Sequence, residues 1–223
     1  MFQRRPRAGA VRAAPVVCAP DELFRWARSG GVLDIVKRAK ALVLSPASEW
    51  RAIERESGDF GYLFANYAAI LAAIPPLCEF VGRGFFRWRG DRLGLHHPHH
   101  FGFFSGLFGA AVHWLAALAF TYAFAVIVDA LAPTFSGRKS RENAIKLAVY
   151  SMTPVWLAGV FALIPALQIL RLAASLYAVY VFWLGLPVLM AAPSDRIGPY
   201  AVASVLGGIL LWFVVAAAVG PFL

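Results

Sequence analysis

Five apolar windows restrict what this chain can fold into more than any other feature of its sequence. They cover roughly residues 60–82, 107–131, 147–165, 172–191 and 199–222. A helix needs about 20 apolar residues to cross the hydrocarbon core of a bilayer, and only helices or closed barrels satisfy the backbone polar groups there. The sequence therefore predicts an all-α, polytopic membrane bundle of about five transmembrane helices, which form one domain over residues 59–223.

The amino-acid composition agrees with this prediction and indicates which kinds of molecule the protein can bind. Hydrophobic residues make up 60% of the 223-residue chain, which is more than one soluble core of that size buries. Only 15% of the residues are charged, yet the formal net charge is +9, so the basic residues gather outside the apolar windows and suit anionic lipid headgroups. No basic groove with stacking aromatics can be drawn on a soluble domain. We therefore expect membrane lipids, and no nucleic acid, as partners.

The segment ahead of the windows divides into a tail and two short helices. Residues 1–32 are basic and lack the apolar region of a secretory signal, so we expect a disordered tail. Residues 33–58 are expected to form two amphipathic helices at the membrane surface. Ser45 is the predicted N-cap of the second helix, Pro46 its first residue, and Trp50 part of its apolar stripe.

Two topologies explain the distribution of lysine and arginine equally well. With a cytoplasmic N-terminus, five spans place ten basic residues inside and five outside, in agreement with the preference of lysine and arginine for cytoplasmic loops. The inside set is Lys37, Arg38, Lys40, Arg51, Arg55, Arg138, Lys139, Arg141, Lys146 and Arg196, and the outside set is Arg83, Arg87, Arg89, Arg92 and Arg171. If the first window instead re-enters at Pro75 and Pro76, four spans give the same bias.

Four charged residues fall inside or beside the windows, where each costs a few kcal/mol unless it has a partner. Five spans bring Glu79 and Arg171 to the outer ends of their helices, and Asp129 and Lys146 to the inner ends. Each acid then has a basic partner on its own side. The alternative is that all four side chains reach the headgroups independently.

Prolines interrupt the third and fourth windows. Pro154 removes a hydrogen bond to the carbonyl of Tyr150 and predicts a kink, at which Ser151 or Thr153 could satisfy the freed group. Pro187 does the same one helix later, beside Gly185. Tyr177 and Tyr180 share a face with this second kink at helical spacing. The two kinked helices are predicted to form a hairpin that serves packing alone or encloses a binding cavity.

These residues also carry a family resemblance. The order Tyr150-Ser151-x-x-Pro154-x-Trp156, then Ile164-Pro165, then Leu176-Tyr177 to Tyr180 and Gly185-Leu186-Pro187, together with the opening LSPASEW that contains Ser45, Pro46 and Trp50, resembles the Yip1 family, particularly its bacterial branch. The resemblance covers about residues 33–222. It implies five spans and a cytoplasmic N-terminus, and so separates the two topologies.

For function, the resemblance implies a multi-pass protein of the bacterial inner membrane with a periplasmic C-terminus and no assigned reaction. Eukaryotic members contact Rab GTPases through an N-terminal acidic-aromatic-Gly-Pro motif. This sequence lacks that motif, which argues against a Rab-type partner.

The loop after the first window contains four histidines within five positions, His96, His97, His99 and His100. Histidine-rich tracts can bind zinc, nickel or copper, but neighbouring histidines around Pro98 cannot all face one ion. The alternatives are a solvated loop between aromatic residues at headgroup level and a lipid contact that depends on pH. No metal or other cofactor is assigned.

No catalytic motif stands out. Ser105 in GFFSG lies one position too far from Gly102 for an intramembrane serine protease, and His113 lies on the same helix. We therefore expect a non-enzymatic protein that organises the membrane or binds lipids, other membrane proteins or itself. The alternative is a small transporter or channel that uses the Pro154 and Pro187 kinks as a midplane site. Small-residue pairs, such as Ser204 with Gly208, are expected to serve internal packing.

Overall fold

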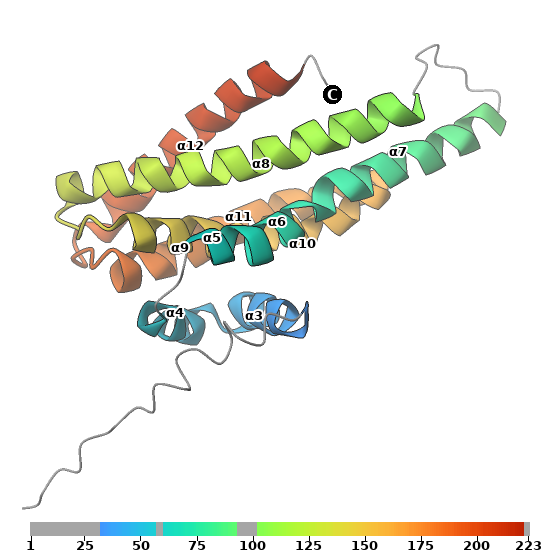
Figure 1. The fold of residues 1–223 in the computed structure, drawn as a ribbon. Coiled ribbons are helices and arrows are strands. Elements are labelled where there is room, and N and C mark those ends of the chain that lie inside the picture. Colours follow the sequence, from blue (N-terminus) through green and yellow to red (C-terminus); the bar gives the residue numbers. More distant parts are fainter. Residues whose placement is uncertain (1–31, 57–59, 93–101, 221–223) are drawn as a thin grey trace, which may run out of the picture.

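A computed structural model describes residues 32–56, 60–92 and 102–220, and every regular element in these ranges is helical. Five helical segments there are long and apolar enough to cross a membrane (Figure 1). They are Phe64–Arg83, Phe103–Phe135, Arg141–Leu163, Gln168–Leu189 and Ile197–Val219. The predicted all-α bundle of five spans is confirmed, with segment ends that differ from the apolar windows by a few residues.

The first span is one irregular helix that continues in one direction (Figure 1). It consists of α5 (Phe60–Leu63), the π-helical turn η1 (Phe64–Ala68), α6 (Ala69–Ala72) and α7 (Ile74–Arg92). Pro75 and Pro76 lie in the first turn of α7, where the missing N–H groups would have no partner within the helix. The re-entrant hairpin that was the alternative is therefore wrong.

The second and fifth spans pack against each other. α8 (Phe103–Leu131) continues into the 3-10 turn η2 (Ala132–Phe135), and α12 (Ile197–Val219) crosses α8 obliquely (Figure 1). At the crossing Ser204 is buried, and a Cβ on Gly208 would lie 3.0 Å from the ring of Phe124. The expected internal role of this small-residue pair is confirmed.

The third span is the centre of the bundle. α9 (Arg141–Ser151), α10 (Thr153–Leu157) and the 3-10 segment η3 (Ala158–Leu163) follow one another, and 72% of this span is buried inside the protein, against 11% for α12. Pro154 lies in the first turn of α10, so the predicted break takes the form of a helix restart. η3 approaches α7 so closely that a Cβ on Gly159 would lie 2.6 Å from Pro75.

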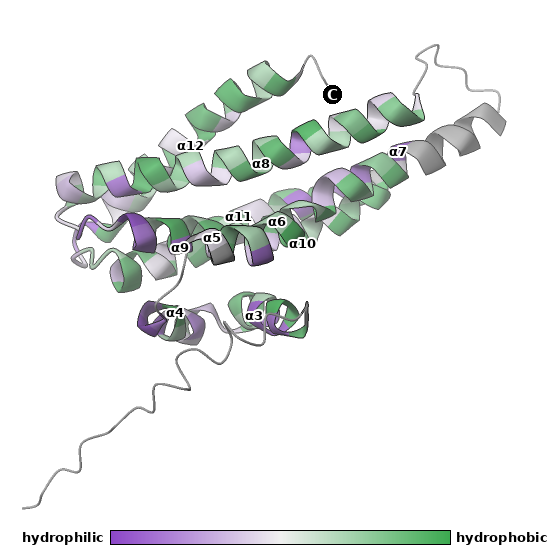
Figure 2. Cartoon of the chain, in the orientation of Figure 1, coloured by the Kyte–Doolittle hydropathy of each residue, from purple (hydrophilic) through white to green (hydrophobic). Residues whose placement is uncertain are grey.

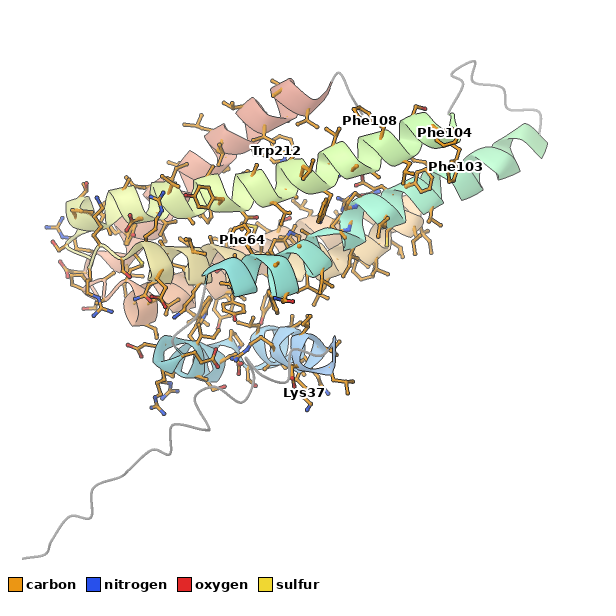
Figure 3. The ribbon with its side chains drawn as sticks, in the orientation of Figure 1. Lys37, Phe64, Phe103, Phe104, Phe108 and Trp212 are labelled. Carbon is orange, nitrogen blue, oxygen red and sulfur yellow. The ribbon has the colours of Figure 1, made fainter. Side chains whose placement is uncertain are left out.

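The fourth span, α11 (Gln168–Leu189), follows the 3-10 turn η4 (Pro165–Leu167) and contains Pro187 in its last turn. The outward faces of the bundle are apolar (Figure 2). Phe104 and Phe108 point away from the bundle (Figure 3), and each exposes more than half of its surface. Such faces suit lipid and not water.

The helices α3 (Val32–Leu44) and α4 (Pro46–Arg55) lie beside the bundle (Figure 1). Their apolar stripe faces the protein, since Leu42, Trp50 and Ile53 are fully buried. The location of these helices at the membrane surface stays a prediction. The predicted tail falls on residues outside the described ranges, apart from Val32, which begins α3.

Candidate functional site

Trp50 fastens α4 to the transmembrane bundle. Its indole Nε1 donates a 3.0 Å hydrogen bond to the carbonyl oxygen of Val181 in α11, and its ring meets the ring of Tyr150 edge-on at 6.4 Å. Gly185 supplies the space: a Cβ there would lie 2.8 Å from the indole and 2.4 Å from Leu147. Glycine is therefore required because α4 approaches α11 closely.

Arg38 ties α3 to both ends of α4. Its guanidinium donates to the carboxylates of Glu49 and Glu56 and stands over the ring of Tyr150 at 5.9 Å. Burial lowers the pKa of Arg38, but the electrostatic effects of Tyr150, Glu56 and Glu49 outweigh burial and raise the pKa above its ordinary value. Lys146 in α9 adds a 2.5 Å hydrogen bond to the carbonyl oxygen of Glu56.

Two tyrosines add side-chain hydrogen bonds, one between α11 and α3 and one between the first and third spans. Tyr177 in α11 donates a 2.7 Å hydrogen bond to the carbonyl oxygen of Val43, at the end of α3. Tyr67 in η1 shares a 2.9 Å hydrogen bond with Thr153, and its ring lies 5.0 Å from that of Tyr150. We call the contacts made by Arg38, Trp50, Tyr150, Tyr177 and Gly185 the α4 clasp.

The structure brings four of the ten predicted motif residues to this clasp, namely Trp50, Tyr150, Tyr177 and Gly185. Pro46 is buried at the first position of α4, and Ser45 is its N-cap residue, without a side-chain capping bond. Ser151 is buried, and its hydroxyl has no hydrogen-bond partner in the described part of the chain. Tyr180 is 51% exposed beside Tyr177.

The hydroxyl of Tyr177, which was expected only to share a face with the Pro187 kink, bonds to the carbonyl oxygen of Val43 in α3.

A second polar cluster joins three spans. Glu79 in α7 accepts a 2.8 Å hydrogen bond from Arg171 Nη1 in α11, and its other oxygen lies 3.3 Å from His113 Nδ1 in α8. Arg171 Nη1 also donates to the side-chain oxygen of Gln168 at 3.1 Å. The predicted pairing of Glu79 with Arg171 is confirmed, and His113 adds a third member.

The other predicted pair is wrong. The nearest cation to Asp129 is Arg141, at 3.9 Å, whereas Lys146 pairs with Glu142 at 2.8 Å, one helical turn earlier. Both pairings join groups at the same end of the bundle, as expected. The rotation of each helix about its axis decides which of them meet.

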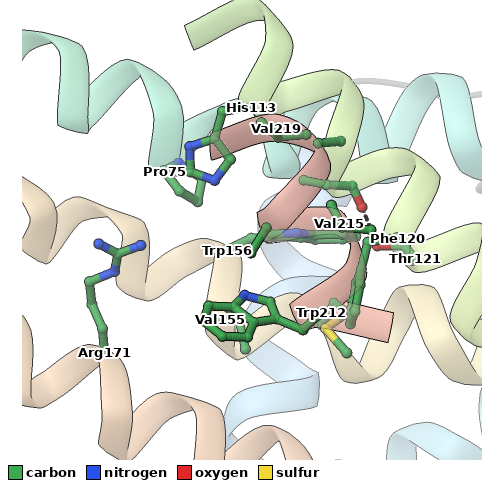
Figure 4. Close-up of a pocket in the computed structure, with 14 residues that line it drawn as sticks. Pro75, His113, Phe120, Thr121, Val155, Trp156, Arg171, Trp212, Val215 and Val219 are labelled. Atoms are coloured by element: carbon green, nitrogen blue, oxygen red, sulfur yellow. Dashed lines mark hydrogen bonds between the residues drawn. The ribbon is translucent and has the colours of Figure 1, made fainter. Parts of the chain in front are cut away.

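A cavity of about 380 Å³ adjoins the cluster, with walls from α7, α8, α10, α11 and α12 (Figure 4). Its lining is apolar apart from His113, Arg171, Thr121 and the indole N–H groups of two tryptophans. Thr121 donates to the carbonyl oxygen of Ala117 in its own helix. The volume lies within the range of about 300–1,000 Å³ that small-molecule sites occupy.

In the part of the chain that the structure describes, no group of three or more His, Cys, Asp or Glu side chains could hold a metal ion. His96, His97, His99 and His100 lie outside the described residues. The α4 clasp consists of packing contacts and charge-assisted hydrogen bonds. Such contacts can hold α3 and α4 in a fixed position against the bundle. The cavity offers an apolar volume with a cationic end.

Sequence reasoning missed the part that His113 plays in the cluster. The available signal was its position: a histidine within an apolar window, at a depth that matches Glu79 and Arg171 in their own windows.

Comparison with known proteins gives two results. Residues 40–217 match the Yip1 domain family. The chain is similar to the inner membrane protein YohC of Escherichia coli K12, with 27% identity over 146 residues, which is 64% of this chain and 73% of that protein. YohC of Escherichia coli O6:H1 strain CFT073 matches to the same extent. No solved structure matches.

Proposed function

The chain belongs to the Yip1 family, and we propose that this multi-pass protein of the bacterial inner membrane organises its surroundings without catalysing a reaction. It does so by presenting α3 and α4 as a fixed surface that binds lipids or neighbouring membrane proteins. The observation that carries the proposal is the α4 clasp, in which a buried tryptophan, a partly buried ion-pair network and the space beside Gly185 hold two short helices against the bundle.

The outward side of α3 supports this role. It exposes apolar and basic side chains together, namely Leu33, Val36, Lys37, Lys40 and Leu44. Figure 3 shows Lys37 on the side away from the bundle. We call these five residues the outer α3 face. A basic and apolar helix face binds anionic membrane surfaces, or a partner that lies on one.

Site-specific cross-linking tests the proposal. A photoreactive amino acid at Val36, activated in intact cells, should give discrete protein or lipid adducts that disappear when Lys37 and Lys40 are both changed to Glu. The same probe at Ile209, which faces outward from α12, is the control for random encounters in the bilayer. Equal adducts at both positions, or adducts unaffected by the charge reversal, would contradict the proposal.

The proposed orientation places the N-terminus in the cytoplasm and the C-terminus in the periplasm. Its support is the count of lysine and arginine: ten lie in α3, in α4 and at the end of the bundle that carries the α8–α9 and α11–α12 connections, against five at the opposite end. A pair of reporters, one active in the cytoplasm and one in the periplasm, can be fused after Phe222 and inserted near Asp91. At both positions the periplasmic reporter should be the active one. A cytoplasmic signal from both positions would reverse the orientation.

A further inference from the structure

The cavity beside the Glu79 cluster ends at a cationic side chain. Arg171 and the imidazole of His113 line it, whereas Glu79 does not. Figure 4 shows these two side chains toward the edge of the cavity and the rings of Trp156 and Trp212 along it. An apolar volume with a cationic end is complementary to an amphipathic ligand with an anionic head.

Arg171 retains hydrogen-bonding capacity for such a ligand. In the described part of the chain, both side-chain bonds of Arg171 leave from Nη1, so Nε and Nη2 keep donors, and the side chain is 32% exposed. Guanidinium groups bind phosphate through two parallel hydrogen bonds. His113 directs Nδ1 at Glu79, which leaves Nε2 on the opposite side of the ring.

The position of the cavity supplies the apolar part of the ligand. One wall is the C-terminal half of α12, including Trp212, Val215 and Val219, and α12 is the least buried of the five spans. Arg171 lies one turn from the start of α11, which is the depth of lipid headgroups for a helix that spans the bilayer. A lipid beside α12 can therefore place its chain in the cavity and its head at Arg171.

We propose that this cavity binds one acyl chain of an anionic glycerophospholipid, whose phosphate contacts Arg171 beside the imidazole of His113. Glu79 positions both side chains and is not itself a ligand. The site goes beyond the proposed function: it lies among α7, α8, α11 and α12, away from the outer α3 face. Failure of one proposal leaves the other standing.

Thermal unfolding in detergent tests the site with phosphatidylglycerol as the anionic probe and phosphatidylcholine as the neutral one. At a hundredfold excess over its Kd, phosphatidylglycerol should raise the apparent Tm by about 5 °C or more. Phosphatidylcholine should have a much smaller effect. Equal shifts with the two lipids would overturn the proposal, because the headgroup would then contribute nothing.

Four variants locate the effect. The double variant Glu79→Gln/Arg171→Gln removes the guanidinium without leaving an unpaired carboxylate. Ala216→Phe fills the cavity but keeps Arg171 and His113. Each should abolish the shift caused by phosphatidylglycerol. Glu79→Gln alone should keep it. Arg196→Gln, which removes an exposed cation at the other end of the bundle, is the matched control and should also keep it. A shift that persists in the double variant or in Ala216→Phe would overturn the proposal.

Photoactivatable phosphatidylglycerol with a diazirine in its acyl chain gives an independent measurement. Adducts should map to residues 152–156 of the cavity wall in the native protein and be lost in Ala216→Phe. Adducts confined to the outward residues of α12 would contradict a chain inside the cavity.

Discussion

Trp50→Ala should detach α4 from the bundle and leave the five spans inserted. The side chain is fully buried and makes its hydrogen bond to Val181 across a gap that Gly185 keeps open. Truncation of a buried tryptophan to alanine costs about 3–5 kcal/mol. Because the lost contacts join a short peripheral helix to the bundle, the cost should appear as local opening of α4 and not as global unfolding.

Proteolysis of the protein in nanodiscs measures this opening. Each 1.4 kcal/mol changes a population tenfold, so cleavage by trypsin after Arg51, which follows the open population when reclosing is fast, should accelerate on the order of 10²–10³-fold. Trp50→Phe keeps the packing and loses the indole donor, so about 1 kcal/mol is lost and the rate should rise roughly fivefold.

Trp183→Ala is the matched control, because Trp183 is also on α11 but is 42% exposed. It should leave the cleavage rate after Arg51 nearly unchanged. If Trp50→Ala accelerates cleavage no more than Trp183→Ala does, the indole does not hold α4 and the argument for a clasp fails.

Three further predictions use the same kind of matched pair. Gly185→Ala, which brings a Cβ to 2.8 Å from the buried indole, should accelerate α4 cleavage by the equivalent of about 1–3 kcal/mol, while Gly198→Ala, with its nearest atom at 3.5 Å, should not. Gly159→Ala should lower the Tm of the bundle, because its Cβ would meet proline backbone at 2.6 Å, and Gly220→Ala, with nothing within 4 Å, should leave the Tm unchanged. Since the pKa of Arg38 is raised, the stabilisation by its charge is complete below the ordinary arginine pKa and is lost only at higher pH. The protection of α4 from trypsin should therefore not fall between pH 7 and 10 through loss of this charge, whereas Arg38→Gln should weaken that protection across the whole range. Tryptic rates normalised to an unstructured peptide measure both effects.

The sequence predicts the spans well because length and hydropathy alone decide whether a helix can cross a bilayer. It places the start of the third span poorly: the apolar window begins at residue 147, but the helix begins at Arg141. Local signals mark that start: the hydroxyl of Ser140 accepts a hydrogen bond from the N–H of Asn143, and Glu142 pairs with Lys146 one turn later. Only the bond from Lys146 to the carbonyl oxygen of Glu56 is tertiary and has no local signal.

The contacts of the candidate site also divide into those that the sequence predicts and those that it does not. The apolar stripe that contains Trp50 can be recognised from the spacing of its residues. The surface that this stripe packs against cannot be predicted in the same way, because lipid and the side of a helix bundle are equally apolar. The pairing of Glu79 with Arg171 follows from depth in the membrane, whereas the partner of Asp129 also depends on helix rotation. Depth is encoded by position in the window, and rotation is set by packing against neighbours.

Pro154 lies in the first turn of α10, where its missing N–H costs little. After Leu157 the central span tightens into the 3-10 helix η3. Six residues at about 2.0 Å per residue rise roughly 12 Å, against about 9 Å in an α-helix. Gly159 lies in η3, and a Cβ there would lie 2.6 Å from Pro75, so a larger residue at position 159 would push α7 away from the central span. Because α7 also carries Glu79, the packing of Pro75 on Gly159 supports the position from which Glu79 meets Arg171.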